Sequence, residues 1–275
     1  MTSTMQRDQD GTLTLTVTIP WIKVEKELEV QIEESVKNTT LKGFRKGKAP
    51  KKMVEEGLDK AKIREDILRK ILPQAYVAAI EEQGISPVIR PSIHIEKVED
   101  GKDWIFTAAT CEVPQIQLNN YKIKVSEVAA KDKIILPGKE PKQPKFEDIM
   151  KALLDTVTIN VPKILINQEV DRLMAQVIDD VRKLGLNLDQ YLTSTGKTPE
   201  SLRADYEQKA LEDIKFEFAL QKVAEEEKIT VEEKEIDEAI KKTKDDKERV
   251  QMESNKYLLA SILRQQKTLD FLKNL

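Results

Sequence analysis

The chain is organised around one short stretch, LKGFRKGKAPKK, which spans residues 41–52 of the 275. The stretch holds six basic residues and no acidic one, although the whole chain carries a formal net charge of −3. Two glycines and a proline oppose regular helix, so we expect these cations to lie on a loop. Phe44 stands among them, and an aromatic ring flanked by cations offers a partner both apolar burial and charge. The composition therefore predicts a docking loop.

The residues before this loop predict a strand followed by a helix. In residues 11–19, Gly11 is followed by strict alternation between threonine and leucine, valine or isoleucine, a pattern typical of a half-buried strand. Pro20 ends the strand, and from Trp21 onward apolar residues recur every four positions. This helix must end before Gly43, so the basic loop follows the helix directly and its cations meet the negative end of the helix dipole.

The residues after the loop predict a second helix and a hairpin. The helix is expected over Ile63–Glu82, with Pro73 kinking or splitting it and Gly84 ending it. Alternation then returns, and the dipeptide at residues 100–101, Asp-Gly, predicts a hairpin turn between two strands. A further strand is expected over Tyr121–Val125.

The order of these elements predicts the domain organisation. Residues 1–126 form an α+β domain, in which helices pack on one face of a small antiparallel sheet. Residues 127–145 are rich in proline and lysine and predict an extended linker. From Phe146 to Leu275 the apolar spacing is helical nearly throughout, so residues 146–275 predict an elongated all-α domain.

Composition excludes several classes of protein. The first ten residues lack the apolar core of a signal peptide, and no apolar run approaches the roughly 18–20 residues of a membrane span. The single cysteine, Cys111, excludes an internal disulfide framework and fits a reducing cytosol. We therefore expect a cytoplasmic protein that makes no contact with membranes.

No motif for a cofactor, a metal or covalent catalysis stands out. The spacing from Gly43 to Lys48 is one residue too short for a phosphate-binding P-loop, and Ala49 replaces the required Ser or Thr. His94 is the only histidine and is expected at an exposed strand position, and no His/Cys cluster suggests a metal site. We predict no cofactor and no catalytic residue. The basic stretch alone could also be a generic nucleic-acid patch or a solvated turn.

The segment GFRKGKAP, residues 43–50, resembles the signature G-F-R-x-G-K-x-P of trigger factor, the bacterial ribosome-associated chaperone family, and fills every position of it. Residues 159–171 also look like the start of the family's helical C-terminal domain. The resemblance implies docking on the large ribosomal subunit at the exit tunnel, on protein and rRNA, and shielding of unfolded nascent polypeptides. The implied ribosome-binding residues are Gly43, Phe44, Arg45, Lys46, Gly47, Lys48 and Pro50. Lys42, Lys51 and Lys52 are expected to add contacts to rRNA phosphates.

One departure from the family pattern affects the expected activity. Family members usually carry an FKBP-type prolyl isomerase domain of about ninety residues between the two regions kept here, where this chain has only the Pro/Lys linker. We therefore expect an ATP-independent chaperone without that domain, although the family is classed as a peptidyl-prolyl isomerase. Two alternatives stay open, a residual prolyl isomerase and a ribosome-independent holdase, as does a homodimer of the free protein.

Overall fold

The structure is a computed structural model that describes residues 1–38, 50, 53, 57, 59–132, 146–243 and 245–275. The chain divides into two compact units, Met1–Val113 and Pro114–Leu275. The division lies before the boundary expected after residue 126. The first unit is α+β, and helices predominate in the second, as the sequence predicted.

The first unit is built on a four-stranded antiparallel sheet with the strand order β1-β2-β4-β3. The strands are β1 (Thr2–Arg7), β2 (Thr12–Ile19), β3 (Ser92–Lys97) and β4 (Trp104–Cys111). The alternation in β2 places its leucines, valine and isoleucine on the buried face, where Leu15 lies opposite Ala108 and Val17 opposite Phe106. The strand and the hairpin predicted from the sequence are therefore confirmed, and β1 is an additional strand.

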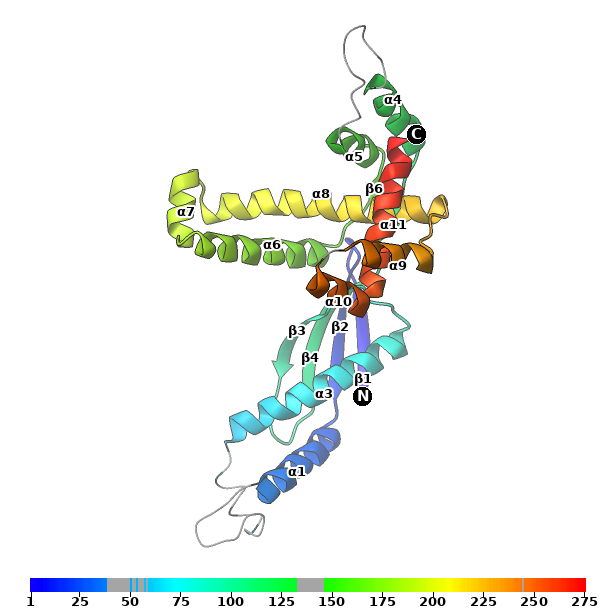
Figure 1. The fold of residues 1–275 in the computed structure, drawn as a ribbon. Helices are drawn as coiled ribbons and strands as arrows, with labels where there is room; N and C mark the ends of the chain where they lie inside the picture. The colour runs from blue at the N-terminus through cyan, green and yellow to red at the C-terminus, as the bar shows by residue number, and fades with distance from the viewer. Residues whose placement is uncertain (39–49, 51–52, 54–56, 58, 133–145, 244) are drawn as a thin grey trace. The chain divides into compact units, whose positions relative to one another are not determined.

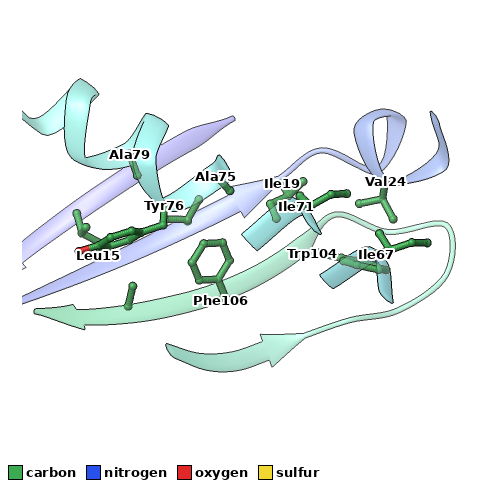
Figure 2. Close-up of a cluster of buried hydrophobic side chains, with 12 residues drawn as sticks. Leu15, Ile19, Val24, Ile67, Ile71, Ala75, Tyr76, Ala79, Trp104 and Phe106 are labelled. Carbon is green, nitrogen blue, oxygen red and sulfur yellow. The ribbon is translucent and has the colours of Figure 1, made fainter. Parts of the chain in front are cut away.

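Among the described residues of the first unit, Trp21–Asn38 form the helix α1 and Lys60–Gln83 form the helix α3 (Figure 1). The core lies between α3 and the sheet, where Trp104 and Phe106 of β4 meet Ile67 and Tyr76 of α3 (Figure 2). The helix α3 runs as a single element through Pro73, so the expected split is absent. Gly84 ends it in the left-handed conformation, with φ of 65°, as predicted.

The second unit is mainly helical. Its elements are β5 (Ile116–Gln117), α4 (Tyr121–Asp132), α5 (Phe146–Leu154), β6 (Thr158–Ile159), α6 (Lys163–Lys183), α7 (Leu188–Thr195), α8 (Pro199–Glu226), α9 (Glu233–Lys242), α10 (Asp246–Ser254) and α11 (Lys256–Lys273). The main core joins α4, α5, α8 and α11, and a smaller core of Val170, Leu173 and Ala210 joins α6 to α8. The paired helices α6 and α8 form an antiparallel arm that turns at α7 (Figure 1).

The strand expected over Tyr121–Val125 is wrong, because these residues open α4. Tyr121, Val125 and Ala129 are buried at a spacing of four, whereas Ile123 is 59% exposed. The helix continues to Asp132, so the first part of the predicted linker 127–145 is helical. Residues 133–145 lie outside the described residues.

Within the described parts of the chain, no helix combines the length and the apolar character needed to cross a bilayer.

Candidate binding surfaces

The predicted docking loop connects two helices that lie side by side. The helices α1 and α3 are antiparallel, with Val24 and Ile67 in the same core and an ion pair between Glu27 and Lys70. The end of α1 and the start of α3 therefore lie at the same end of the unit (Figure 1). The chain between them, residues 39–58, contains the whole family signature.

Of the predicted docking residues, the structure describes Pro50 alone. Pro50 is exposed, and its carbonyl oxygen accepts a hydrogen bond of 3.0 Å from the Met53 N–H group. The other predicted docking residues lie outside the described residues; they are Lys42, Gly43, Phe44, Arg45, Lys46, Gly47, Lys48, Lys51 and Lys52.

The helix that follows the docking segment has a well-defined beginning. The Asp59 carboxylate accepts hydrogen bonds from the N–H groups of Ala61, at 2.9 Å, and Lys62, at 3.3 Å. A capping carboxylate stabilises a helix start by about 1 kcal/mol. Farther along α3, Lys70 donates a hydrogen bond to the Glu27 carboxylate of α1, and this bond raises the pKa of Lys70. These contacts fix the start of α3 and its packing against α1.

A groove in the second unit forms a different candidate surface. It has a volume of about 550 Å³ and lies between α8, α11 and the connection from α8 to α9. Leu220, Ala224 and Thr268 are its buried residues, whereas Tyr257 beside them is 91% exposed. The remaining lining is mixed, with aliphatic, hydroxyl, amide and charged side chains: Glu217, Gln221, Ile229, Thr230, Val231, Ala260, Ser261, Arg264 and Gln265.

Hydrogen bonds from α11 hold the connection that forms one side of the groove. Arg264 Nε donates to the Ile229 carbonyl oxygen at 2.9 Å, and Lys267 Nζ donates to the Thr230 carbonyl oxygen at 2.9 Å. Lys267 also forms an ion pair of 2.8 Å with Glu235 of α9. These contacts hold the backbone of the connection against α11.

Exposed apolar side chains continue from the groove along α11. Leu258 is 60% exposed and Ile262 is 52% exposed, one helical turn apart. Another exposed leucine, Leu184, follows the end of α6 in the arm and is 76% exposed. Helical spacing alone could not separate these residues from the core, because core and exposed positions share the same periodicity.

A hydrogen-bond cluster fixes α4 against the end of α8. Tyr121, which is 3% exposed, donates its phenolic O–H to Glu227 Oε1 at 2.8 Å, and Lys122 Nζ lies 2.6 Å from the same oxygen. Burial and the hydrogen bond to Glu227 raise the pKa of Tyr121. The hydrogen bonds from Lys122 and Tyr121 lower the pKa of the Glu227 carboxyl. Within the cluster, Glu227 is the residue that follows the last turn of α8 and precedes the connection to α9.

Cys111 and His94 are the single cysteine and the single histidine of the sequence. Cys111 is fully buried, and burial together with the nearby Asp10 charge raises the pKa of its thiol to about 11. The thiolate, which is the reactive form, is therefore scarce at neutral pH. His94 lies exposed on β3, as predicted.

Comparison with known proteins identifies relatives over both units. Two protein-family models match, one described as "Bacterial trigger factor protein (TF)" over residues 1–135, the other as "Bacterial trigger factor protein (TF) C-terminus" over residues 138–274. Residues 136 and 137 alone lie between the two matches. The chain therefore has no room for an intervening domain of about ninety residues.

Curated relatives share part of the chain. Trigger factor of Macrococcus caseolyticus is 45% identical over 108 residues, which cover 39% of this chain and 25% of the relative. Trigger factor of Halalkalibacterium halodurans is 39% identical over 122 residues, which cover 44% of this chain and 28% of the relative. The matched part of the chain spans about a quarter of the length of these relatives.

A solved structure shares the fold. It is described as "Promiscuous Substrate Recognition in Folding and Assembly Activities of the Trigger Factor Chaperone" and superposes with a TM-score of 0.66. The likeness covers 100% of this chain and 99% of that one, at 11% sequence identity. At this identity the likeness concerns the fold alone.

Proposed function

The chain belongs to the trigger factor family, in a form without the prolyl isomerase domain, and from this premise we propose an ATP-independent chaperone that docks at the ribosomal exit. The single observation that carries the proposal is that two models of one chaperone family match consecutive parts of nearly the whole chain. The partners are the large ribosomal subunit and unfolded nascent polypeptides, and the site of action is the cytoplasm.

The docking half of the proposal assigns ribosome binding to residues 43–50. Phe44 supplies apolar burial on ribosomal protein, while Arg45 and Lys46 supply charge. Lys42, Lys51 and Lys52 add sequence-independent contacts to rRNA phosphates. The packing of α1 against α3 supports this assignment, because the two helices that flank the segment share one core and an ion pair.

The client-binding half of the proposal assigns nascent-chain contacts to the helical unit. Removing apolar client surface from water contributes about 25 cal/mol per Å², so a few exposed side chains give contacts of modest strength. Tyr257, Leu258 and Ile262 beside the groove provide such contacts, and Leu184 in the arm adds another. Because the contacts are individually weak, clients leave without an energy source.

Sedimentation with purified bacterial ribosomes tests the docking half. The variant F44A/R45A/K46A removes one aromatic residue and two cations, and we expect it to lose ribosome binding at physiological salt. A matched control is R182A/K183A/L184A at the end of α6, which removes one apolar residue, the exposed Leu184, and two cations. Equal binding by the wild type and F44A/R45A/K46A would refute docking through this loop.

Suppression of aggregation of an unfolded model protein tests the client-binding half. The variant Y257S/L258S/I262S removes exposed apolar surface from α11 without touching its buried face. We expect a several-fold higher concentration of this variant for half-maximal suppression, with unchanged ribosome sedimentation. Full suppression by the variant would show that clients bind elsewhere.

A further inference from the structure

The strand β3 lies at one edge of the four-stranded sheet (Figure 1). The strand order β1-β2-β4-β3 gives it β4 on one side and no described strand on the other. In an antiparallel ladder, the N–H and C=O groups of successive residues point alternately toward the neighbouring strand and away from it. The groups of β3 that point away from β4 therefore have no ladder partner within the part of the chain that the structure describes.

Two isoleucines give this edge an apolar side. Ile93 lies opposite Ala108 of β4, and Ile95 lies opposite Phe106, so both are on the face of the sheet that packs against α3. Neither isoleucine belongs to the described core, and they are 40% and 43% exposed. Because residues two apart in a strand share one face, the isoleucines form an apolar strip beside the unpaired backbone.

The opposite edge of the sheet, β1, is more polar and is tied to α3. Ser3 Oγ donates to Glu82 Oε2 at 2.7 Å, and Gln83 Nε2 donates to the Ser3 carbonyl oxygen at 3.3 Å. Among the exposed residues of β1, Met5 alone is apolar. The apolar pair at alternate positions thus distinguishes β3 from β1.

The open edge of β3 is short. Pro91 precedes the strand and has no N–H group to donate, and the pairing with β4 shifts register between Ile95 and Lys97. A regular added strand therefore fits Ser92–Ile95. A stable interface between folded proteins takes about 20–30 residues on each side. This edge consequently suits a flexible extended segment that binds weakly, and not a second folded copy.

We propose that β3 takes up an extended segment of unfolded polypeptide as an additional strand of the sheet. This inference rests on the proposed chaperone function and adds a client site in the first unit that recognises a different feature of the client. Backbone hydrogen bonds hold the segment whatever its sequence, and apolar residues at alternate positions pack against Ile93 and Ile95. A proline in the paired stretch removes a donor, so the site selects extended segments without proline.

Fluorescence anisotropy with a labelled peptide and the full chain tests strand addition. The probe alternates valine and threonine and carries lysines at both ends for solubility. A second peptide has the same side chains but is N-methylated at each backbone amide of the alternating stretch, so it cannot donate backbone hydrogen bonds. The loss of two or more hydrogen bonds should weaken its binding at least roughly tenfold. Equal binding of the two peptides would overturn the proposal.

Two lysines placed on the edge test its location. The variant I93K/I95K replaces the apolar strip with charges, which natural edge strands use to prevent pairing. We expect it to bind the unmethylated peptide several-fold more weakly than the wild type, with little change in thermal unfolding, because both positions are exposed. The control T2K/T4K adds the same charge at alternate exposed positions of β1 and should bind as the wild type does. Equal affinities of I93K/I95K and T2K/T4K would contradict binding at β3.

Amide hydrogen exchange locates the bound peptide directly. Strand addition should slow exchange in Ser92–Lys97 and leave exchange in Thr2–Arg7 unchanged, because only the paired edge gains hydrogen bonds. Slower exchange in β1 or α11, with none in β3, would place the peptide elsewhere and refute strand addition. Sedimentation equilibrium detects the competing occupant: a wild-type dimer that I93K/I95K dissociates would show that β3 pairs with a second copy, which also overturns the proposal.

The failure of this inference differs from the failure of the proposed function. If the wild type suppresses no aggregation, the proposed chaperone function fails and the client site on β3 fails with it. If the wild type suppresses aggregation but the peptide slows no exchange in β3, strand addition alone is refuted.

Discussion

Tyr121 shows how one side chain fixes the first helix of the second unit. Its phenolic O–H donates to the Glu227 carboxylate between α4 and the end of α8, where the Tyr121 side chain is almost fully buried. We expect Tyr121→Phe to lower the free energy of unfolding of this unit by about 1–2 kcal/mol, because the acceptor is charged. Denaturant unfolding followed by circular dichroism measures the change. Tyr257→Phe, at an exposed position, is the control and should leave stability unchanged.

The Glu227 carboxyl gives the same contact a pH dependence. Its pKa is lowered from the usual 4.5, first by the hydrogen bond from Lys122 and then by that from Tyr121. A carboxyl with a lowered folded-state pKa stabilises the fold above its unfolded-state pKa, and this stabilisation is lost as the pH falls through the folded value. Glu227→Gln should therefore destabilise the protein at pH 7, and its difference from wild type should shrink below pH 4.5. A difference that grew on acidification would contradict this assignment.

Pro73 lies in the interior of α3, which continues through it without a break. The residue is exposed, and it cannot donate the backbone hydrogen bond that a helix interior normally makes to the residue four positions earlier. A proline in a helix interior is about 3 kcal/mol less favourable than alanine. Proline also restricts the unfolded chain, which offsets about 1 kcal/mol of this destabilisation. Pro73→Ala should stabilise the first unit by about 2 kcal/mol. Gln74→Ala, at the next exposed position, should change stability by less than about 0.5 kcal/mol. Thermal unfolding that is unchanged or earlier in Pro73→Ala would show that the ring makes compensating contacts.

The elements that could be predicted from sequence are those whose apolar spacing fits only one type of secondary structure. Strict alternation over residues 11–19 fits only a strand, and β2 lies there. Tyr121–Val125 satisfies both a period of two and a period of four, so sequence alone could not reveal that Val125 and Ala129 continue a buried helical face. The strand β1 was missed because it is an exposed edge strand whose residues show no apolar alternation.

At the scale of the whole molecule, the two candidate surfaces differ in how far sequence predicts them. The proposed docking segment is contiguous, so its charge and glycine content predict it directly. The groove needs α8, α11 and the connection after α8 to come together, which no local pattern encodes.

The division into two units predicts two independent unfolding transitions. Each unit has its own buried core, in Met1–Val113 and in Pro114–Leu275. Both tryptophans, Trp21 and Trp104, belong to the first unit, so tryptophan fluorescence reports on it alone, whereas helical circular dichroism reports mainly on the second.

A matched pair of core substitutions separates the two transitions. Leu15 and Leu153 are both fully buried, one in the core of each unit. Leu15→Ala should shift the fluorescence transition, and Leu153→Ala the dichroism transition, each by about 2–5 kcal/mol, because each leaves a cavity in one core only. Neither substitution should move the other transition, since sites without shared contacts are energetically independent. If Leu153→Ala shifted both transitions equally, the units would unfold as one, and docking and client binding would have to be treated as properties of a single cooperative body.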